Sequence, residues 1–151
     1  MGEEFKRWKG HSVESLWNSD EVSYKEVFSC DTIGVVAMDK DGTTAAACST
    51  GGITPMMLGR VGDVPMIGCG FYAGGAGAIA ATGIGEEIIK RMLAKTVYDM
   101  ILNGDDITTS CKKGVSLFPD EVPVGLVGIS RTGYAVASNR EMAHYALIKH
   151  R

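Results

Sequence analysis

The stretch that most restricts how this chain can fold runs from Thr32 to Thr50 and has the pattern of a tight β-hairpin. The segment TIGVVAMD predicts one strand, TTAAACST predicts its return strand, and KDG between them predicts a three-residue loop in which Gly42 takes the left-handed conformation. If residues 40–42 form that loop, the register sets Thr32 directly opposite Thr50. Because cross-strand Cβ atoms lie only about 5 Å apart, the hairpin alone brings two threonine hydroxyls together.

The rest of the chain alternates between short apolar runs and helical periodicity. Seven apolar residues at helical spacing predict one helix over 83–104, which Gly104 ends: Ile88, Ile89, Met92, Leu93, Val97, Met100 and Ile101. The other segments are predicted as two strands before that helix, a helix after it, and a final hairpin: 66–73, 77–82, 106–117, 122–130 and 134–138. This order indicates an α+β protein with largely antiparallel sheets and helices packed outside them.

Composition divides the 151 residues into a leader, 1–31, and one domain, 32–151. The leader is highly charged, contains both tryptophans and shows no sustained period, which is typical of a flexible segment. The formal net charge of -3 predicts no attraction to nucleic acid or to anionic lipid. No apolar run approaches the roughly 20 residues that a membrane span needs, and the N-terminus lacks the apolar core of a secretory signal. We therefore expect a cytoplasmic protein.

Several kinds of site are disfavoured by the residues present. The four cysteines are scattered without a C-x-x-C pair, so we interpret them as small buried hydrophobes rather than as a disulfide framework. The three histidines lie in the leader and the tail without a metal-ligand partner, so no metal site is expected. The run GCGFYA, over residues 68–73, matches G-x-G-x-x-A but is not followed by a helix, and tight backbone packing explains its glycines better than a dinucleotide does. No cofactor is expected.

Two other segments contain candidate binding residues. In GRVGDVP, Arg60 and Asp63 are charges among small and apolar residues; together they suit an α-amino acid, and a plain ion pair between them is the equal alternative. In ATGIGEE, Thr82 and Gly83 precede the predicted helix, where free N–H groups can stabilise a negative oxygen. Capping of the helix by Thr82 is the simpler alternative there.

Taken together, four motifs resemble the asparaginase-like N-terminal-nucleophile hydrolases. They are DTIGVVAMDKDGTTAAACSTGG, GRVGDVP, GFYA and ATGIGE, in the family's order and close to its spacing. The resemblance implies an αββα four-layer sandwich, of which this chain is a part, and a precursor that cuts its own chain between Asp31 and Thr32. It further implies that the hydroxyl of the new N-terminal Thr32 is the nucleophile and its freed α-amine the base. An α-amine, with a pKa of about 7.7–8.0, suits that task near neutral pH.

The resemblance also implies roles for the other candidates. Thr50 would hydrogen-bond near the nucleophile, Arg60 would bind the substrate α-carboxylate, and Asp63 would bind its α-amino group. Thr82 and Gly83 would form the oxyanion hole. The implied reaction cleaves the side-chain amide of L-asparagine, or a β-aspartyl (isoaspartyl) peptide, through a covalent β-aspartyl ester.

The chain departs from the family in two respects. Members have a long α-subunit before the cut, whereas only 31 residues precede Thr32 here, so an α-subunit-like chain or a second copy is the expected partner. Aspartate before the threonine is the habit of glycosylasparaginases, whereas STGG resembles the asparaginase branch. Two alternatives therefore stay open: a half-protein that is inactive alone and serves as an assembly partner, and a glycosylasparaginase.

Overall fold

A computed structural model of the chain describes residues 32–53 and 56–148. The strands follow the expected order, four before the helical region and two after it, but three helices stand where two were expected. The strands are β1 (Thr32–Met38), β2 (Thr44–Thr50), β3 (Phe71–Gly74), β4 (Gly77–Gly83), β5 (Val124–Ser130) and β6 (Gly133–Ser138). The helices are α4 (Gly85–Arg91), α5 (Leu93–Leu102) and α6 (Ile107–Ser116). Among the described residues, none of these helices combines the length and the apolar character needed to cross a bilayer.

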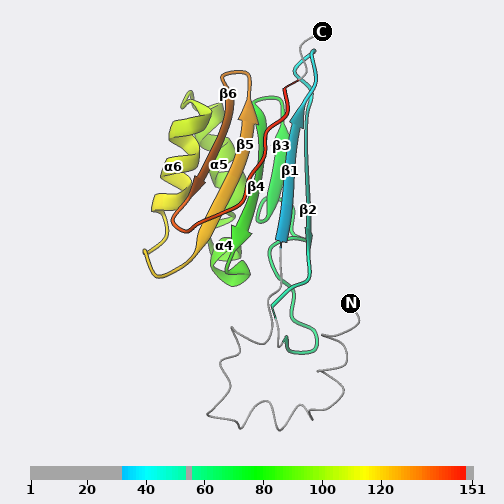
Figure 1. The fold of residues 1–151 in the computed structure, drawn as a ribbon, viewed down its shortest axis with the longest axis vertical. Helices are drawn as coiled ribbons and strands as arrows, with labels where there is room; N and C mark the ends of the chain where they lie inside the picture. Colours follow the sequence, from blue (N-terminus) through cyan, green and yellow to red (C-terminus); the bar gives the residue numbers. More distant parts are fainter. Residues whose placement is uncertain (1–31, 54–55, 149–151) are drawn as a thin grey trace.

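The strands form two antiparallel sheets that pack face to face. One sheet contains β1 and β2, and the other has the order β3-β4-β5-β6. The helices cover the far side of the four-stranded sheet, so that three layers follow one another: helices, large sheet, small sheet (Figure 1). The prediction of an α+β fold with antiparallel sheets and helices packed on them is confirmed, and the described residues supply three of the four layers of an αββα sandwich.

The first hairpin has the predicted register. Thr32 lies opposite Thr50, and Met38 lies opposite Thr44 at the loop end. The Asp39 N–H donates to the Thr43 carbonyl at 3.0 Å, and Gly42 has φ +86°, which closes the three-residue loop as its sequence indicates. The local loop chemistry is therefore sufficient to place the two threonines together.

Close contacts hold the small sheet on the large one. A Cβ built on Gly34 would lie only 2.9 Å from the Ala80 Cβ, so the two sheets approach closely at this point. The Thr44 hydroxyl donates to the Gly74 carbonyl at 2.7 Å, which joins β2 to the end of β3. The outer face of the small sheet is uncovered among the described residues, and Ile33 and Val35 are 63% and 53% exposed there.

The main core lies between the helices and the large sheet. Its largest fully buried apolar side chains come from α4, α5, α6 and the two central strands: Ile79, Ile88, Leu93, Val97, Ile107 and Leu126. The expected burial of cysteines is confirmed for Cys69 and Cys111, whereas Cys48 is half-buried, and all three are free thiols. Burial raises the pKa of Cys111 to about 12, which makes its thiol unreactive.

The predicted single helix over 83–104 is wrong, because the helix breaks at Met92. This residue has φ 43° and ψ 52°, a left-handed conformation that costs a non-glycine residue on the order of 1–3 kcal/mol. The break lets the first turn of α5 bind the preceding loop: the Ala94 N–H donates to the Cys69 carbonyl and the Lys95 N–H to the Gly68 carbonyl. Met92 is consequently half exposed rather than part of the apolar stripe.

The predicted strand over 66–73 is also too long, since β3 begins only at Phe71. The Asp63 carbonyl accepts hydrogen bonds from the N–H groups of both Met66 and Gly70, at 3.0 and 3.1 Å. These bonds fold residues 63–70 into compact turns instead of an extended strand. Asp63 also lies against the start of α4, where a Cβ built on Gly85 would be 2.9 Å from its Oδ1 atom.

Candidate active site

The two threonines of the hairpin form the centre of the candidate site. The hydroxyl oxygens of Thr32 and Thr50 lie 2.9 Å apart, at hydrogen-bonding distance. The Thr50 hydroxyl also accepts the N–H of Gly52 at 3.0 Å. Either hydroxyl can donate to the other, and because Thr50 accepts the Gly52 N–H with a lone pair, its own proton stays available for donation to Thr32.

A cavity of about 280 Å³ opens beside this pair. Of the residues expected to make the site, five line it: Thr32, Thr50, Arg60, Asp63 and Gly83. These residues come from the ends of β1, β2 and β4 and from the loop that precedes β3. The topology thus brings together residues that are as many as 51 positions apart in the sequence, Thr32 and Gly83, around one hollow.

Asp63 is the buried charge of the cavity. Its side chain belongs to a residue only 7% exposed, and among the described residues no hydrogen-bond donor reaches its Oδ2 atom. Burial raises the pKa of this carboxyl above its ordinary value, and the nearby Arg60 opposes that effect. A buried carboxylate oxygen without a partner is costly unless a ligand satisfies it, which makes Asp63 a suitable acceptor for an ammonium group.

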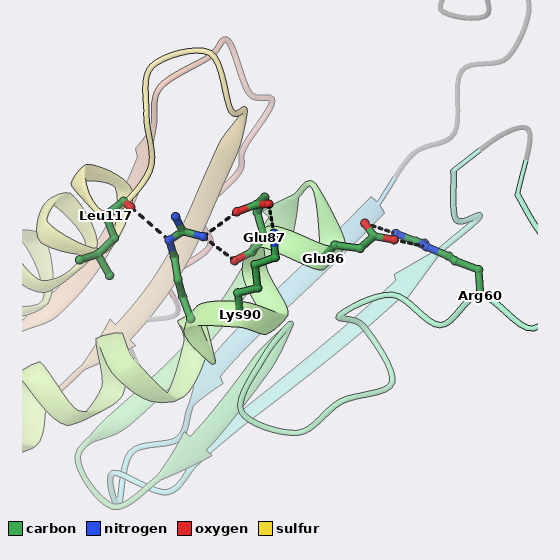
Figure 2. Close-up of polar contacts among 6 residues, drawn as sticks. Arg60, Glu86, Glu87, Lys90 and Leu117 are labelled. Atoms are coloured by element: carbon green, nitrogen blue, oxygen red, sulfur yellow. Dashed lines mark hydrogen bonds and ion pairs between the residues drawn. The ribbon is translucent and has the colours of Figure 1, made fainter.

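One of the two sequence interpretations was an ion pair between Arg60 and Asp63. This interpretation is wrong, because Arg60 pairs with Glu86 instead. The Nε and Nη2 atoms of Arg60 donate to the two carboxylate oxygens of Glu86, at 2.8 and 2.9 Å, in a bidentate ion pair (Figure 2). The guanidinium beside Glu86 lowers the pKa of that carboxyl to about 2. Glu86 was not among the residues expected from the sequence. Its only signal there is a pair of acidic residues in the first turn of the helix, and nothing local distinguishes Glu86 from Glu87.

Thr82 and Gly83 end strand β4, directly before α4. The alternative that Thr82 caps the helix is wrong, because Ile84 occupies the N-cap position and no side chain caps the helix there. Thr82 does not line the cavity with Arg60; it lines a neighbouring cavity of about 620 Å³ that also reaches Thr32 and Gly83. At Gly83, with φ +149°, a Cβ would lie 2.5 Å from the Pro123 carbonyl oxygen, so only glycine fits this corner.

Asp31 and the whole leader, 1–31, lie outside the described residues, and so do Cys30, His11 and His150. The expectations about the cleavage point and the leader therefore stay predictions. His144 is described, and its exposed ring is within hydrogen-bonding distance of the Met142 carbonyl oxygen, at 3.2 Å. In the run GCGFYA, Gly70 packs against Asp63, since a Cβ there would lie 2.8 Å from the Asp63 carbonyl oxygen. This supports tight packing as the reason for that glycine.

Comparison with known proteins identifies sequence relatives of this chain. The family model described as Asparaginase matches residues 3–151. A plant-type L-asparaginase of Pyrobaculum calidifontis is 44% identical over 109 residues, which cover 68% of this chain and 36% of that protein. An isoaspartyl peptidase/L-asparaginase of Macaca fascicularis is 41% identical over 109 residues, covering 70% of this chain and 35% of that protein.

A third relative represents the glycosylated-asparagine branch. The N(4)-(beta-N-acetylglucosaminyl)-L-asparaginase of Elizabethkingia miricola is 32% identical over 139 residues, which cover 85% of this chain and 40% of that protein. The chain thus spans well under half the length of each of these relatives. The family model nevertheless matches nearly the whole chain, and the chain therefore belongs to the asparaginase family, whose members include plant-type L-asparaginases, isoaspartyl peptidases and glycosylasparaginases.

Proposed function

We propose that this protein is an amidohydrolase that cleaves the side-chain amide of L-asparagine or the isopeptide bond of β-aspartyl peptides. The observation that carries the proposal is the pair of hydroxyls of Thr32 and Thr50, 2.9 Å apart, on a cavity that also holds one arginine and one buried aspartate. A cation and an anion on one cavity match the α-carboxylate and α-ammonium groups of an amino acid. The threonine pair would then face its side-chain amide.

In the proposed mechanism, autoproteolysis between Asp31 and Thr32 removes the leader and frees the α-amine of Thr32. That amine takes the proton of the Thr32 hydroxyl as the oxygen attacks the amide carbon. Thr82 and Gly83 stabilise the negative oxygen of the tetrahedral intermediate. The proton then passes to the leaving nitrogen, and ammonia or a peptide amine departs. A water molecule, deprotonated by the same amine, hydrolyses the β-aspartyl-Thr32 ester and releases aspartate.

We propose that Thr50, Arg60 and Asp63 support this chemistry without bonding covalently to the substrate. The Thr50 hydroxyl stabilises the developing charge on the Thr32 oxygen, since it can donate across 2.9 Å. Arg60 binds the α-carboxylate and Asp63 the α-ammonium group, whose proton donors would satisfy the unpartnered Oδ2 atom. The substrate ammonium group thereby neutralises the buried charge of Asp63, which the free site holds at a cost.

The experiment that tests the proposal is an intact mass of freshly purified chain, repeated after a day of incubation and followed by ammonia release from L-asparagine. We expect a fragment that begins at Thr32, and hydrolysis that appears together with it. Thr32→Ala should abolish both, because loss of the nucleophile removes several powers of ten in rate. Ser49→Ala is the matched control, since Ser49 adjoins Thr50 but faces outward and is exposed. Full hydrolysis by Thr32→Ala would overturn the assignment.

A second candidate is a half-protein that becomes active only with a partner. The observation in its favour is the uncovered outer face of the small sheet, where the apolar side chains of Ile33 and Val35 are mostly exposed among the described residues. We propose an α-subunit-like chain or a second copy as the partner. An uncleaved, inactive chain that matures when such a partner is added would support this candidate over self-sufficient activity.

A glycosylasparaginase is the remaining alternative for the substrate. The Elizabethkingia miricola relative supports it, and so does the neighbouring cavity of about 620 Å³, which reaches Thr32 and is larger than an ammonia leaving group requires. Comparing kcat/KM for L-asparagine, a β-aspartyl dipeptide and glycosylated asparagine would rank the three. Activity on the glycosylated substrate alone would replace the asparaginase assignment.

A further inference from the structure

Arg60 is held from one side by a residue that does not line the cavity. Glu86 receives two of the five guanidinium N–H groups, those on Nε and Nη2, in a planar fork-to-fork arrangement. The Glu86 side chain is 49% exposed and is absent from the lining of the cavity, whereas the Arg60 side chain is only 18% exposed and is part of it. The carboxylate therefore approaches Arg60 from the solvent side.

The other edge of the guanidinium faces the cavity. A Cβ built on Gly62 would lie 2.9 Å from Nη1 of Arg60, and one built on Gly85 would lie 2.9 Å from Nη2. Both glycines line the cavity. The three N–H groups that Glu86 does not use make no hydrogen bond to any residue within the described ranges. They form a second donor edge of the kind that binds a carboxylate bidentately.

The ion pair is stable in the range where such an enzyme would be assayed. Arg60 is the main reason that the pKa of Glu86 falls to about 2, so Glu86 stays ionised at any pH above that value. The same pairing raises the pKa of Arg60. By contrast Glu87, the next residue of α4, faces away and pairs with Lys90 and Arg91 (Figure 2). The chain thus contains two adjacent glutamates of which only one reaches Arg60.

From these contacts we infer that Glu86 is a positioning residue: it fixes the Arg60 guanidinium so that its free donor edge points into the cavity and selects substrates with an α-carboxylate. This inference rests on the proposed function, because it needs an amino-acid substrate at Arg60. Without Glu86 the long arginine side chain regains rotamer freedom, and its donor edge faces the cavity only part of the time. Substrate binding is then weakened, while the chemistry at Thr32 is left unchanged.

The test compares Glu86→Gln with Glu87→Gln, which is matched in charge, size and helix position. The amide of Glu86→Gln offers one acceptor and one donor to a group that only donates, so the bidentate contact is lost. For hydrolysis of L-asparagine we expect KM to rise about tenfold, the loss that follows from weakening one charge-assisted hydrogen bond, with kcat within about twofold. Glu87→Gln should leave both constants unchanged.

Two further measurements separate positioning from a merely structural role. The substrate in which an amide replaces the α-carboxylate of asparagine should be hydrolysed equally by the native chain and by Glu86→Gln. In an Arg60→Lys background, which retains the charge but not the fork, Glu86→Gln should cause little additional loss. Equal losses on both substrates, a fall in kcat at constant KM, or full additivity with Arg60→Lys would overturn the inference.

Calorimetric binding of L-aspartate separates this inference from the proposed function. If the native chain binds L-aspartate without hydrolysing asparagine, and Glu86→Gln binds it about tenfold more weakly, the inference stands and the proposed function fails. If the native chain hydrolyses asparagine and Glu86→Gln does so equally well, the proposed function stands and the inference fails. If the native chain binds no L-aspartate, Arg60 recognises no α-carboxylate and the inference is overturned.

Discussion

A single methyl group added at Gly85, the first residue of α4, should weaken substrate binding while the chain still folds. Gly85 is buried against the two charged residues of the cavity. A Cβ at this position would lie 2.9 Å from Nη2 of Arg60, 2.9 Å from Oδ1 of Asp63 and 3.2 Å from the Asp63 backbone nitrogen. Ordinary contacts of a Cβ begin near 3.4 Å, so Gly85→Ala has to displace both charged groups by roughly 0.5 Å.

The effects of Gly85→Ala on stability and on activity differ in size. Alanine favours a helix over glycine by at most about 1 kcal/mol, and less at the first position, while mild overpacking costs about 1–3 kcal/mol. The net loss of stability should therefore stay below about 3 kcal/mol. Since a misplacement of 1 Å in a binding site can cost about 10²-fold in rate, half of that displacement predicts a fall in kcat/KM of about tenfold, which is close to 1.4 kcal/mol.

The assay is kcat/KM for L-asparagine together with the midpoint of thermal unfolding. Gly75→Ala is the matched control, because a Cβ there meets nothing within 4 Å of described structure and its φ is one that alanine adopts. We expect Gly85→Ala to raise KM about tenfold and to lower Tm by no more than about 9 °C, from roughly 3 °C per kcal/mol at this chain length. An unchanged KM would refute the argument that Gly85 makes room for the charged pair.

The remaining predictions concern the hydroxyl pair, the buried carboxyl and the core. Thr50→Val removes the hydroxyl 2.9 Å from the Thr32 oxygen and keeps its shape, so kcat should fall about 10²-fold at similar KM, while Ser49→Ala stays near native activity. Burial raises the pKa of Asp63, and the charged groups facing it are Arg60 and Glu86. KM should therefore rise as pH falls, beginning at a higher pH than for an ordinary aspartate, because a protonated Asp63 no longer attracts the ammonium group. Asp63→Asn should abolish this pH dependence of KM; if the dependence persists in the variant, another group titrates. Leu126→Ala should lower the free energy of unfolding in urea by about 2–5 kcal/mol, since this side chain is fully buried. Val35→Ala, on the uncovered outer face of the small sheet, should lower the free energy of unfolding of the isolated chain far less. Similar losses of stability in the two variants would contradict the location of the core.

The first hairpin and helix α6 are the parts of the fold that could be predicted from sequence. A three-residue loop with glycine at its last position sets the register of β1 and β2, and the register in turn places Thr32 beside Thr50. Helix α6 likewise begins where its sequence indicates, because the Asp106 carboxylate accepts the N–H groups of Thr108 and Thr109. In both cases the interacting groups lie within a few residues of the loop or cap that determines them.

The helix break could not be predicted in this way. The apolar stripe across Met92 has a continuous helical period, and nothing near it in the sequence interrupts a helix. The break is stabilised by carbonyl groups of Gly68 and Cys69, more than twenty positions earlier, which accept from the first turn of α5. A local pattern contains no information about that loop, so the tertiary contact outweighs the helical propensity.

The candidate site, too, could be predicted from the sequence only in part. The residue types that suit an amino-acid substrate, namely the threonines, Arg60 and Asp63, could be named from the sequence and from its family resemblance. That Asp63 is buried with an unpartnered oxygen, and that Arg60 pairs with Glu86 rather than with Asp63, depends on how the loop before β3 packs against α4. The sequence by itself determined which groups are available and which near neighbours meet. Only the tertiary structure decided which charge meets which, because burial and ion pairing arise where segments distant in the chain come together.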